Sequence, residues 1–327
     1  MKKAAWILAF VFGLAFLGAT LMNADLIAGS RKALARGVLR DKSSIPAARY
    51  QLVVVLPDTD DSFFRGILDG IREAAPSFES AVQVFRYPQA SVSEAARYYE
   101  IALRAKVDGL IMYTPRNDLD AGRGERARRN GVIFVPVGTD APPGSRPGFI
   151  GSGSLLQGFE GGTLICAQLG SSSRIGVILP SSGTGDPGEE PLYRGVSAAI
   201  KAFPGATIAA VARAQPGVLS GEEAASSLLR KDPSINALFC SSSLDTTGAA
   251  QVVVDLNRVG RIVIVGADET PEIRRYIDKG VVAASIVRDS RRIGLEAVRL
   301  FSRLKAGALA TETVEVGFSV KLSKGAE

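Results

Sequence analysis

The chain contains two similar segments, about one domain length apart, and each begins with a short apolar strand. The first strand, residues 53–57, runs into a polar loop and then into a helix that carries residues 65–71. The second strand, residues 177–180, likewise runs into a polar loop and then into a helix that carries residues 194–200. In each case an apolar strand is followed by an amphipathic helix that opens a second strand and helix cycle. The repeat therefore predicts two similar α/β lobes with a cleft between them.

Short apolar stretches continue to alternate with helical patterns from residue 51 to the end of the chain. Strands are predicted near residues 51–57, 82–86, 108–112, 132–137, 147–150, 174–179, 207–213, 236–240, 262–266 and 283–287, with a last long helix near 291–305 and a final strand near 312–321. This alternation is typical of parallel sheets that are covered by helices on both faces. Ligands of such sheets lie at the carboxyl ends of the strands. Function is therefore expected in the loops after Pro57, Met112, Val137, Pro180, Phe239 and Val265.

Charge is distributed unevenly along the 327 residues, whose formal net charge is +6. Residues 1–49 hold eight Lys or Arg and two Asp, so they account for the whole excess. The remaining residues carry 31 basic and 31 acidic side chains. Because phosphate binding needs a basic face, a nucleic acid is not expected as a partner of this neutral body.

The chain has no histidine, which removes the commonest general base and the commonest metal ligand together. No cofactor, no metal and no enzymatic activity are therefore predicted. Cys166 and Cys240 both lie in apolar runs and are interpreted as buried, unpaired side chains, although a disulfide between them stays open in an oxidising compartment.

The amino terminus is interpreted as a membrane-targeting segment. Lys2 and Lys3 precede residues 4–22, which carry no charged side chain. This stretch is long for a signal-peptide core and close to the ~20 residues that span a bilayer as a helix. Residues 1–25 are thus a cleaved signal peptide or an uncleaved anchor, and the basic stalk or linker at 26–49 favours the anchor. In both cases the folded body is expected in the periplasm or cell envelope.

The loop after the first strand holds the most unusual group of side chains, Asp61, Phe63 and Phe64. Asp61 alone could be a helix cap. Neighbouring helical positions point about 100° apart, so both aromatic rings cannot face one core. At least one Phe is expected to face the cleft, where a ring beside carboxylate acceptors suits a polyhydroxylated ligand.

Two other loops carry polar clusters. Residues 183–188 match the spacing of a dinucleotide-binding loop, but acidic side chains crowd its helix end and Pro187 lacks an N–H donor, which favours a flexible loop. Residues 240–245 offer hydroxyl groups without a histidine or a nucleophile elbow. Helix capping and contact with a ligand are the two interpretations left for them.

Asp268 and Arg288 each follow a strand of the second segment. Asp268 could cap the helix that begins near Pro271, or it could accept hydrogen bonds from ligand hydroxyls. Arg288 would be costly to bury alone, so a carboxylate partner or an anionic ligand group is expected beside it.

Seven motifs in this order resemble those of the periplasmic sugar-binding proteins of the ribose and galactose type. These type I periplasmic binding proteins are also related to the effector domains of the lac repressor family. The resemblance covers residues 50–327. The motifs are VVVLPDTDDSFFRGILDGI, KVDGLIMYTP, VPVGTDAP, FIGSGSLLQG, INALFCSSSLDTTGAAQVV, IVIVGADETPEIRRYIDKG and AASIVRDSRRIGLEAV.

The resemblance implies two Rossmann-like lobes with parallel sheets, joined by three crossover strands that act as a hinge. The first lobe would comprise residues 50–152 plus 289–316, and the second 153–288 plus 318–327. The ligand positions of the family fall on Asp61, Phe63, Phe64, Thr114, Asp140, Ser152, Ser242, Asp268 and Arg288.

The chain also departs from the family pattern. Leu192 stands where sugar binders often have an arginine, and Arg194 two residues later is the candidate replacement. Val218 replaces an aromatic side chain, Ser242 an amide, and Arg288 a common glutamine. An anionic or otherwise modified ligand therefore becomes possible beside a plain pentose or hexose.

The resulting hypothesis is a solute-binding protein that captures a small polar ligand, expected to be a carbohydrate, for the permease of an ABC-type importer. The alternative is a membrane-anchored sensor that signals ligand occupancy to a partner kinase or receptor. A transcriptional repressor would need a helix-turn-helix before residue 50, and that segment is apolar and then basic. An enzyme is the least favoured alternative.

Overall fold

The computed structural model describes residues 48–89, 91–113, 122–138, 149–180, 185–215, 217, 219–308 and 313–324. Residues 49–327 form one compact unit. The predicted signal peptide or anchor and nearly all of the predicted stalk lie outside the described residues. Within the described ranges, none of the helices has the length and apolar character needed to cross a bilayer.

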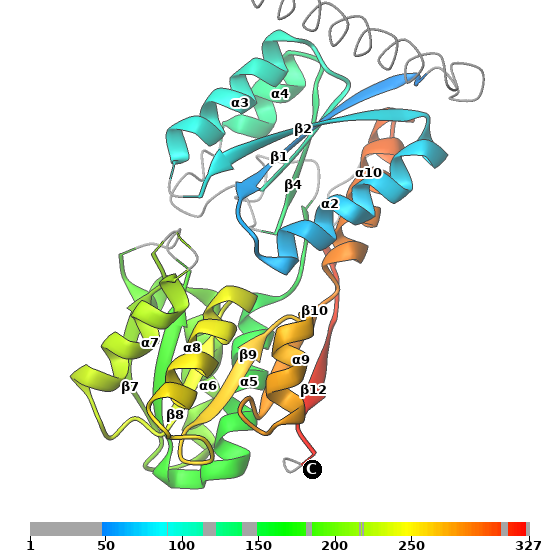
Figure 1. Ribbon diagram of the computed structural model, residues 1–327. Coiled ribbons are helices and arrows are strands. Elements are labelled where there is room, and N and C mark those ends of the chain that lie inside the picture. Colours follow the sequence, from blue (N-terminus) through cyan, green and yellow to red (C-terminus); the bar gives the residue numbers. More distant parts are fainter. Residues whose placement is uncertain are drawn as a thin grey trace, which may run out of the picture. The chain divides into compact units, whose positions relative to one another are not determined.

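The first lobe is built on a six-stranded, fully parallel sheet (Figure 1). Its spatial order is β11-β5-β4-β3-β1-β2. Strand β1 carries three consecutive valines and is buried from Leu52 to Pro57, as expected where helices cover both faces of the sheet. The strands are β1 (Tyr50–Asp58), β2 (Ser80–Pro88), β3 (Gly109–Tyr113), β4 (Ile133–Val137), β5 (Phe149–Gly151) and β11 (Thr313–Glu315).

The second lobe repeats this plan with the order β12-β10-β9-β8-β6-β7. All of its neighbours are parallel except β12, which runs antiparallel to β10. The α/β fold class predicted from the internal repeat is thus confirmed. The strands are β6 (Arg174–Leu179), β7 (Thr207–Arg213), β8 (Ala237–Cys240), β9 (Val263–Ala267), β10 (Ala284–Arg288) and β12 (Phe318–Leu322).

Helices cover both faces of each sheet and enclose four apolar clusters (Figure 1). The first lobe contains α2 (Ser62–Ala74), α3 (Val92–Arg104), α4 (Arg123–Arg129) and α10 (Ser290–Lys305). The second contains α5 (Ser154–Leu169), α6 (Pro191–Ala199), α7 (Ser220–Lys231), α8 (Ser243–Asp255) and α9 (Pro271–Asp278). Short 3₁₀ turns occupy Ala75–Phe78, Gly170–Ser172, Pro187–Glu189 and Ile200–Ala202. Both cysteines are buried and free, as the apolar runs around them predicted.

The chain crosses between the lobes three times: between β5 and α5, between β10 and α10, and between β11 and β12. The single final strand predicted at 312–321 is therefore wrong. It is two strands in two different sheets, because the chain leaves the first sheet after Glu315 and joins the second at Phe318.

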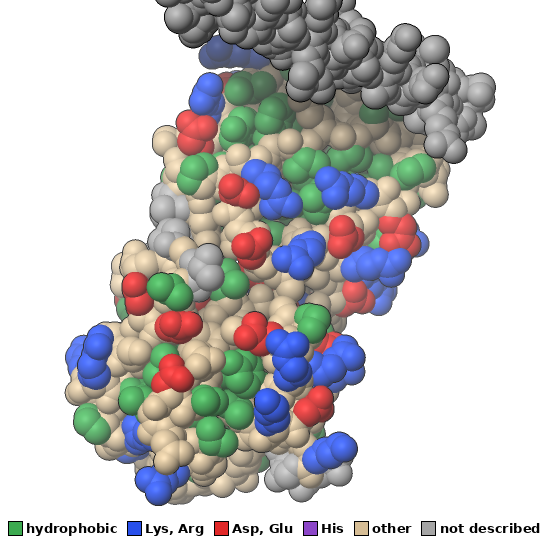
Figure 2. Space-filling model, viewed as in Figure 1, with side chains coloured by type: hydrophobic (Ala, Val, Ile, Leu, Met, Phe, Trp, Pro, Cys, Tyr) green, Lys and Arg blue, Asp and Glu red, His purple; other side chains and the backbone are tan. Residues whose placement is uncertain are grey.

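The described surface mixes charges of both signs. Figure 2 shows Lys or Arg side chains interspersed with Asp or Glu side chains on the visible face of both lobes. This distribution agrees with the balanced charge counted for the body of the chain.

Glycine lets one helix of each lobe pack closely against its partner. In the first lobe a Cβ at Gly294 of α10 would overlap the carbonyl oxygen of Ile67 in α2. In the second lobe a Cβ at Gly195 of α6 would overlap the carbonyl oxygen of Leu155 in α5. Backbone therefore meets backbone at these two helix crossings, which leaves no room for a side chain.

We expect Gly294→Ala to destabilise the protein by about 1–3 kcal/mol, because the added methyl group must push α10 away from α2. Gly185→Ala is the matched control, since a Cβ there meets nothing within 4 Å. Thermal unfolding of the two variants measures the difference. Equal melting temperatures would contradict the close packing described.

Candidate functional site

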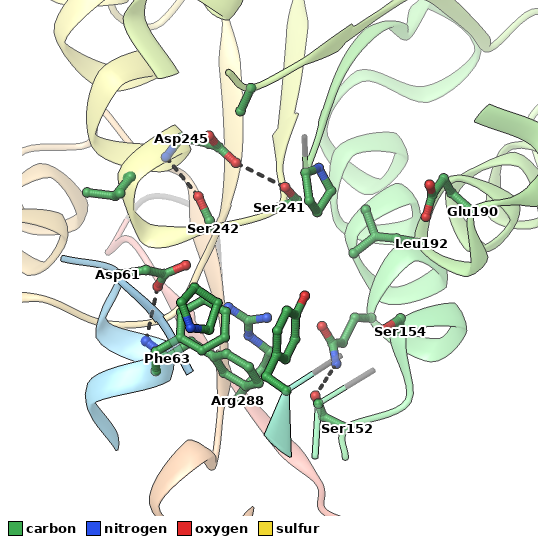
Figure 3. A pocket seen from close by; sticks show the side chains of 18 of the residues that line it. Asp61, Phe63, Ser152, Ser154, Glu190, Leu192, Ser241, Ser242, Asp245 and Arg288 are labelled. Carbon is green, nitrogen blue, oxygen red and sulfur yellow. Dashed lines mark hydrogen bonds between the residues drawn. The ribbon is translucent and has the colours of Figure 1, made fainter. Parts of the chain in front are cut away.

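A cavity of about 330 Å³ lies between the two lobes (Figure 3). Its walls come from the carboxyl ends of strands in both sheets, as the sequence predicted. Pro57, Tyr113 and Gly138 mark the ends of β1, β3 and β4 in the first lobe. Pro180 and Ser241 follow β6 and β8 in the second lobe. The volume falls at the lower end of the range for small-molecule sites, about 300–1,000 Å³.

Asp61 caps α2 and also joins the two lobes. Its Oδ1 accepts hydrogen bonds from Phe63 N and from Ser243 Oγ, both at 3.0 Å. Ser243 begins α8 in the second lobe, and its Oγ also accepts a hydrogen bond from Ser62 N at 3.3 Å. The side chain of Asp61 is 7% exposed and lines the cavity. The capping interpretation and the cleft interpretation of Asp61 therefore both describe its position.

Phe63 and Phe64 both line the cavity and are also buried in the first lobe. Their rings meet edge to face, with centroids 5.4 Å apart. Phe64 makes a second edge-to-face contact with Tyr113, at 4.8 Å. The expectation that the two rings cannot face one core is wrong, because both belong to the same apolar cluster of the first lobe. The expectation of at least one ring at the cleft agrees with the structure, which places both there.

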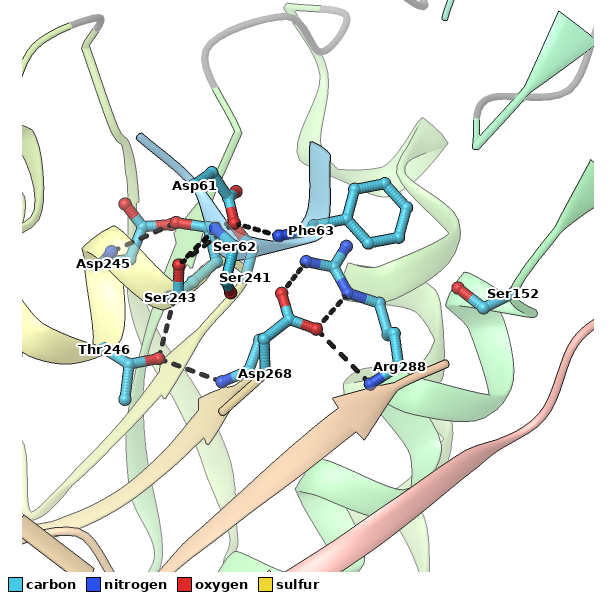
Figure 4. A network of polar contacts seen from close by, with 12 residues as sticks. Asp61, Ser62, Phe63, Ser152, Ser241, Ser243, Asp245, Thr246, Asp268 and Arg288 are labelled. Carbon is cyan, nitrogen blue, oxygen red and sulfur yellow. Dashed lines mark hydrogen bonds and ion pairs between the residues drawn. The ribbon is translucent and has the colours of Figure 1, made fainter. Parts of the chain in front are cut away.

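Arg288 ends β10 and lies at the cavity, paired with Asp268 (Figure 4). Arg288 Nε donates to Asp268 Oδ1 at 2.9 Å, and Arg288 Nη2 pairs with Oδ2 of the same carboxylate. The guanidinium carbon lies 3.9 Å from the centroid of the Phe63 ring, which is a cation–π contact between the lobes. Of the two partners expected for Arg288, the structure therefore provides the carboxylate.

Asp268 does not line the cavity, and it does not cap α9. Thr270 is the cap, because its side chain accepts a hydrogen bond from Ile273 N at 3.1 Å. Asp268 adopts a positive φ of 62° that turns its carboxylate toward Arg288. This geometry makes Asp268 a residue that positions Arg288, whereas the sequence suggested a cap or a direct ligand contact.

Asp245 is a cavity residue that the sequence reasoning did not single out. It lies in the first turn of α8, is 2% exposed, and accepts a hydrogen bond from Ser241 Oγ at 3.0 Å (Figure 3). Ser242, a predicted site residue, lines the cavity and caps the same helix, because its Oγ accepts from Asp245 N at 3.1 Å. The Ser-x-x-Asp spacing is a capping signal that could have located the turn. The burial of the Asp245 carboxylate, in contrast, depends on tertiary contacts that this spacing does not indicate.

Burial shifts the pKa values of these groups. Burial raises the pKa of Asp245 to about 7. Burial also raises the pKa of Asp61, and the nearby charge of Asp268 adds to the effect. For Arg288 burial opposes the charge, but attraction to and hydrogen bonds with Asp268 raise its pKa further above the ordinary value. Arg288 therefore stays charged, whereas the two carboxyl groups are held in an environment short of positive charge.

The part of the cavity wall away from Asp61, Asp245 and Arg288 holds uncharged polar groups and one neutralised carboxylate. Ser152, a predicted site residue, accepts a hydrogen bond from Gln157 Nε2 at 2.8 Å, and both side chains are buried. Glu190 is paired with Arg213 at 3.3 Å. Leu192, interpreted from the sequence as a departure from a position where sugar binders often have an arginine, also lines the cavity.

Besides Asp268, three more predicted site residues are not among the described lining residues. Arg194 is exposed on α6 and does not line the cavity, as expected for a residue beside Gly195, whose own side faces α5. Thr114 and Asp140 lie outside the described residues.

The described part of the chain places no group of three or more His, Cys, Asp or Glu side chains that could hold a metal ion.

A family model described as a periplasmic binding protein domain matches residues 52–309. The chain belongs to the periplasmic binding protein family. Among curated relatives of this family, the D-allose-binding periplasmic protein of Escherichia coli K12 is 22% identical over 81% of this chain and 86% of its own length. The ribose import binding protein RbsB of the same organism is 20% identical over 84% of this chain and 90% of its own length.

Solved periplasmic binding proteins share the fold. The glucose-galactose binding protein GanP of Geobacillus stearothermophilus is 26% identical, with a TM-score of 0.74 over 84% of this chain and 98% of its own. A solute-binding protein of Actinobacillus succinogenes with bound D-allose is 15% identical, with a TM-score of 0.74 over 85% and 99%. The XylFII–LytSN complex contains a chain that is 23% identical, with a TM-score of 0.71 over 84% and 98%. The family resemblance and the fold predicted from the motifs are confirmed.

We expect Asp268→Ala to destabilise the protein by about 3–5 kcal/mol, because Arg288 would keep its charge in a buried position without its partner. Asp278→Ala removes an exposed carboxylate of the same lobe and should change stability by less than about 0.5 kcal/mol. Thermal unfolding compares the two variants. A melting temperature of Asp268→Ala equal to that of the control would contradict the role given to the ion pair.

The raised pKa values also predict how stability depends on pH. The unfolded chain loses the Asp245 proton near pH 4, whereas the folded protein holds it to about pH 7. Stability should therefore fall as the pH rises through this window, by up to about 1.4 kcal/mol per pH unit for one such proton. Asp61, whose pKa is also raised, contributes in the same direction.

Thermal unfolding at pH 5, 6 and 7 tests this pH dependence. Asp245→Asn cannot titrate, so its melting temperature should fall less steeply than that of the unmodified protein, while Asp278→Asn should follow the unmodified protein. Parallel curves for Asp245→Asn and the unmodified protein would count against a protonated Asp245 in the folded state.

Proposed function

We propose that this protein captures a small sugar or sugar derivative in the cavity between its lobes and delivers it to an ABC-type importer without changing it chemically. The observation that carries the proposal is the shared cavity, whose polar walls come from the strand ends of both lobes. The names of two curated relatives refer to D-allose and to ribose import, and a structural relative holds D-allose. Membership of this family also implies export to the periplasm.

The side chains that line the cavity fall into three chemical groups, and each group would contact the ligand in a different way. The aromatic side chains Phe63 and Phe64 supply the apolar surface, and the hydroxyl groups of Ser152 and Ser242 supply neutral donors and acceptors. Asp61, Asp245 and Arg288 supply charged hydrogen-bonding groups. Thr114 and Asp140, which lie outside the described residues, stay in the proposed ligand set from the sequence. Asp268 contributes to ligand binding indirectly, because it holds Arg288 in place. Arg194 is not part of the proposed ligand set.

Closure around the ligand would be a hinge motion at the three crossovers. A ligand that contacts both lobes stabilises the closed arrangement more than the open one. The hydrogen bond from Ser243 to Asp61 already joins the lobes directly. In this proposal the ligand adds to a contact that the protein makes by itself.

A thermal-shift screen of the purified protein against neutral, amino and acidic sugars tests the binding. A true ligand should raise the melting temperature in a concentration-dependent way. Ser154 lines the cavity from the start of α5 and is only partly buried, so Ser154→Phe should fill the cavity and abolish the shift, while Ser154→Ala should keep it. A shift that survives in Ser154→Phe would place binding elsewhere. Failure of every sugar would contradict the proposed function.

A sensor role is the second candidate. The uncharged residues 4–22 and the basic stalk favour an anchored protein, and XylFII, a structural relative, has been solved together with LytSN. Mass spectrometry of the mature protein distinguishes a chain that begins at Met1 from one that begins near Asp25. Loss of ligand uptake in a strain that lacks the protein would support the importer role, and unchanged uptake would favour the sensor.

A further inference from the structure

The charge balance of the cavity is the feature that the proposed function leaves unexplained. Among its described lining residues are four carboxylates and one guanidinium. The carboxylates belong to Asp61, Glu190, Asp245 and Glu315, and the guanidinium belongs to Arg288. Buried charges in proteins are normally paired. The pairing of each group therefore decides which charge remains for a ligand.

Two of these carboxylates do not contribute to a buried excess. Glu190 is neutralised by its ion pair with Arg213. Glu315 is exposed at the cavity edge, where water solvates it. Asp61 and Asp245 are different, because they are 7% and 2% exposed and neither forms an ion pair with a described residue.

Arg288 cannot balance both of these carboxylates. Its guanidinium makes a two-point contact with Asp268, a third buried carboxylate. One face of the guanidinium also lies against the Phe63 ring. One positive charge thus serves three carboxylates, and the pair it forms with Asp268 is already complete. An anionic ligand, which Arg288 suggested at the level of the sequence, would meet an excess of negative charge here.

The two remaining carboxylates lie at the same end of the cavity. Asp61 comes from the first lobe and Asp245 from the second, and Ser243 Oγ, two residues before Asp245, donates to Asp61 (Figure 4). Their environments are coupled, because the charge of Asp61 adds to the burial that raises the pKa of Asp245. A cation placed between them would contact both lobes at once and stabilise the ionised form of both carboxyl groups.

We propose that the ligand carries a protonated amino group, as amino sugars and amino polyols do, and that Asp61 and Asp245 bind this ammonium group from the two lobes. The inference rests on the proposed function and narrows its ligand class. The neighbouring serine hydroxyl groups and the aromatic wall contact the rest of the ligand. A neutral sugar cannot stabilise the ionised forms of these two carboxyl groups.

Isothermal titration calorimetry of the full-length protein against matched sugars tests the inference. The series compares D-glucose, D-galactose, D-mannose, D-allose and D-ribose with their 2-amino-2-deoxy counterparts, and it includes D-glucuronate and N-acetyl-D-glucosamine. At pH 6.5 we expect an amino sugar to bind at least about tenfold more tightly than its neutral parent, which corresponds to about 1.4 kcal/mol. The acidic and the acetylated sugars should not show this gain.

Two charge-removing variants assign the gain to its residues. Asp61→Asn and Asp245→Asn should each weaken binding of the amino sugar about tenfold and change binding of the neutral parent much less, because the amide keeps the shape of the side chain and can still hydrogen bond. Asp278→Asn, an exposed change in the same lobe, should leave both affinities unchanged. The use of two variants keeps the test valid if one of them folds poorly.

The outcomes separate this inference from the proposed function. Neutral or acidic sugars that bind as tightly as the amino sugars would overturn the inference and leave sugar binding intact. A preference for amino sugars that survives in both Asp→Asn variants would also overturn the assignment. If no sugar of any charge binds, the proposed function itself fails.

Discussion

The buried ion pair between Asp268 and Arg288 is the interaction on which the cleft depends. Arg288 stands at the end of β10, where the chain crosses from the second lobe to the first, and its guanidinium also touches Phe63. Without Asp268 this charge would be buried alone, which costs several kcal/mol. The pair therefore fixes a charged group at the hinge, places it against an aromatic side chain of the opposite lobe, and neutralises the charge of the one guanidinium among the described lining residues.

Direct contact between the lobes gives the closed arrangement a basis that does not require a ligand. The Asp61–Ser243 hydrogen bond joins the cap of α2 to the first turn of α8. A net hydrogen bond of this kind contributes only about 0.5–1.5 kcal/mol, which is small enough for opening to remain accessible. The same carboxylate lines the cavity, so a ligand that binds Asp61 acts on the group that already connects the two halves. Binding and closure are thus coupled through one side chain.

The sequence predicted most of the fold because local patterns decided it. Apolar strands and amphipathic helices predicted nearly every element. Each of the two repeated helices carries an Arg-Gly pair, Arg65-Gly66 and Arg194-Gly195, whose glycine packs closely against a neighbouring helix. The arginine of each pair, Arg65 or Arg194, is exposed. The split of the last strand could not be predicted from its composition, because only the crossover assigns its halves to different sheets. It was the family resemblance that placed a lobe boundary near residue 317. Asp61 and Phe63 were located from their place after a strand, and Ser242 from the family resemblance. The burial of Asp245 and the turn of Asp268 toward Arg288 depend on tertiary contacts.

The unbalanced carboxylates make sense only if stability and binding are considered together. Burying Asp61 and Asp245 without cations stabilises their protonated forms and raises their pKa values, so the protein by itself tolerates them at the expense of stability near neutral pH. A site built only for neutral hydroxyl groups could use amides, which donate and accept hydrogen bonds without this cost. Carboxyl groups are justified physically where a positive charge arrives, because an ammonium group stabilises their ionised forms and makes charge-assisted hydrogen bonds with them. Binding of a cationic ligand between the closed lobes would relieve the stability cost of burying these carboxyl groups, and this relief favours cationic ligands over neutral ones.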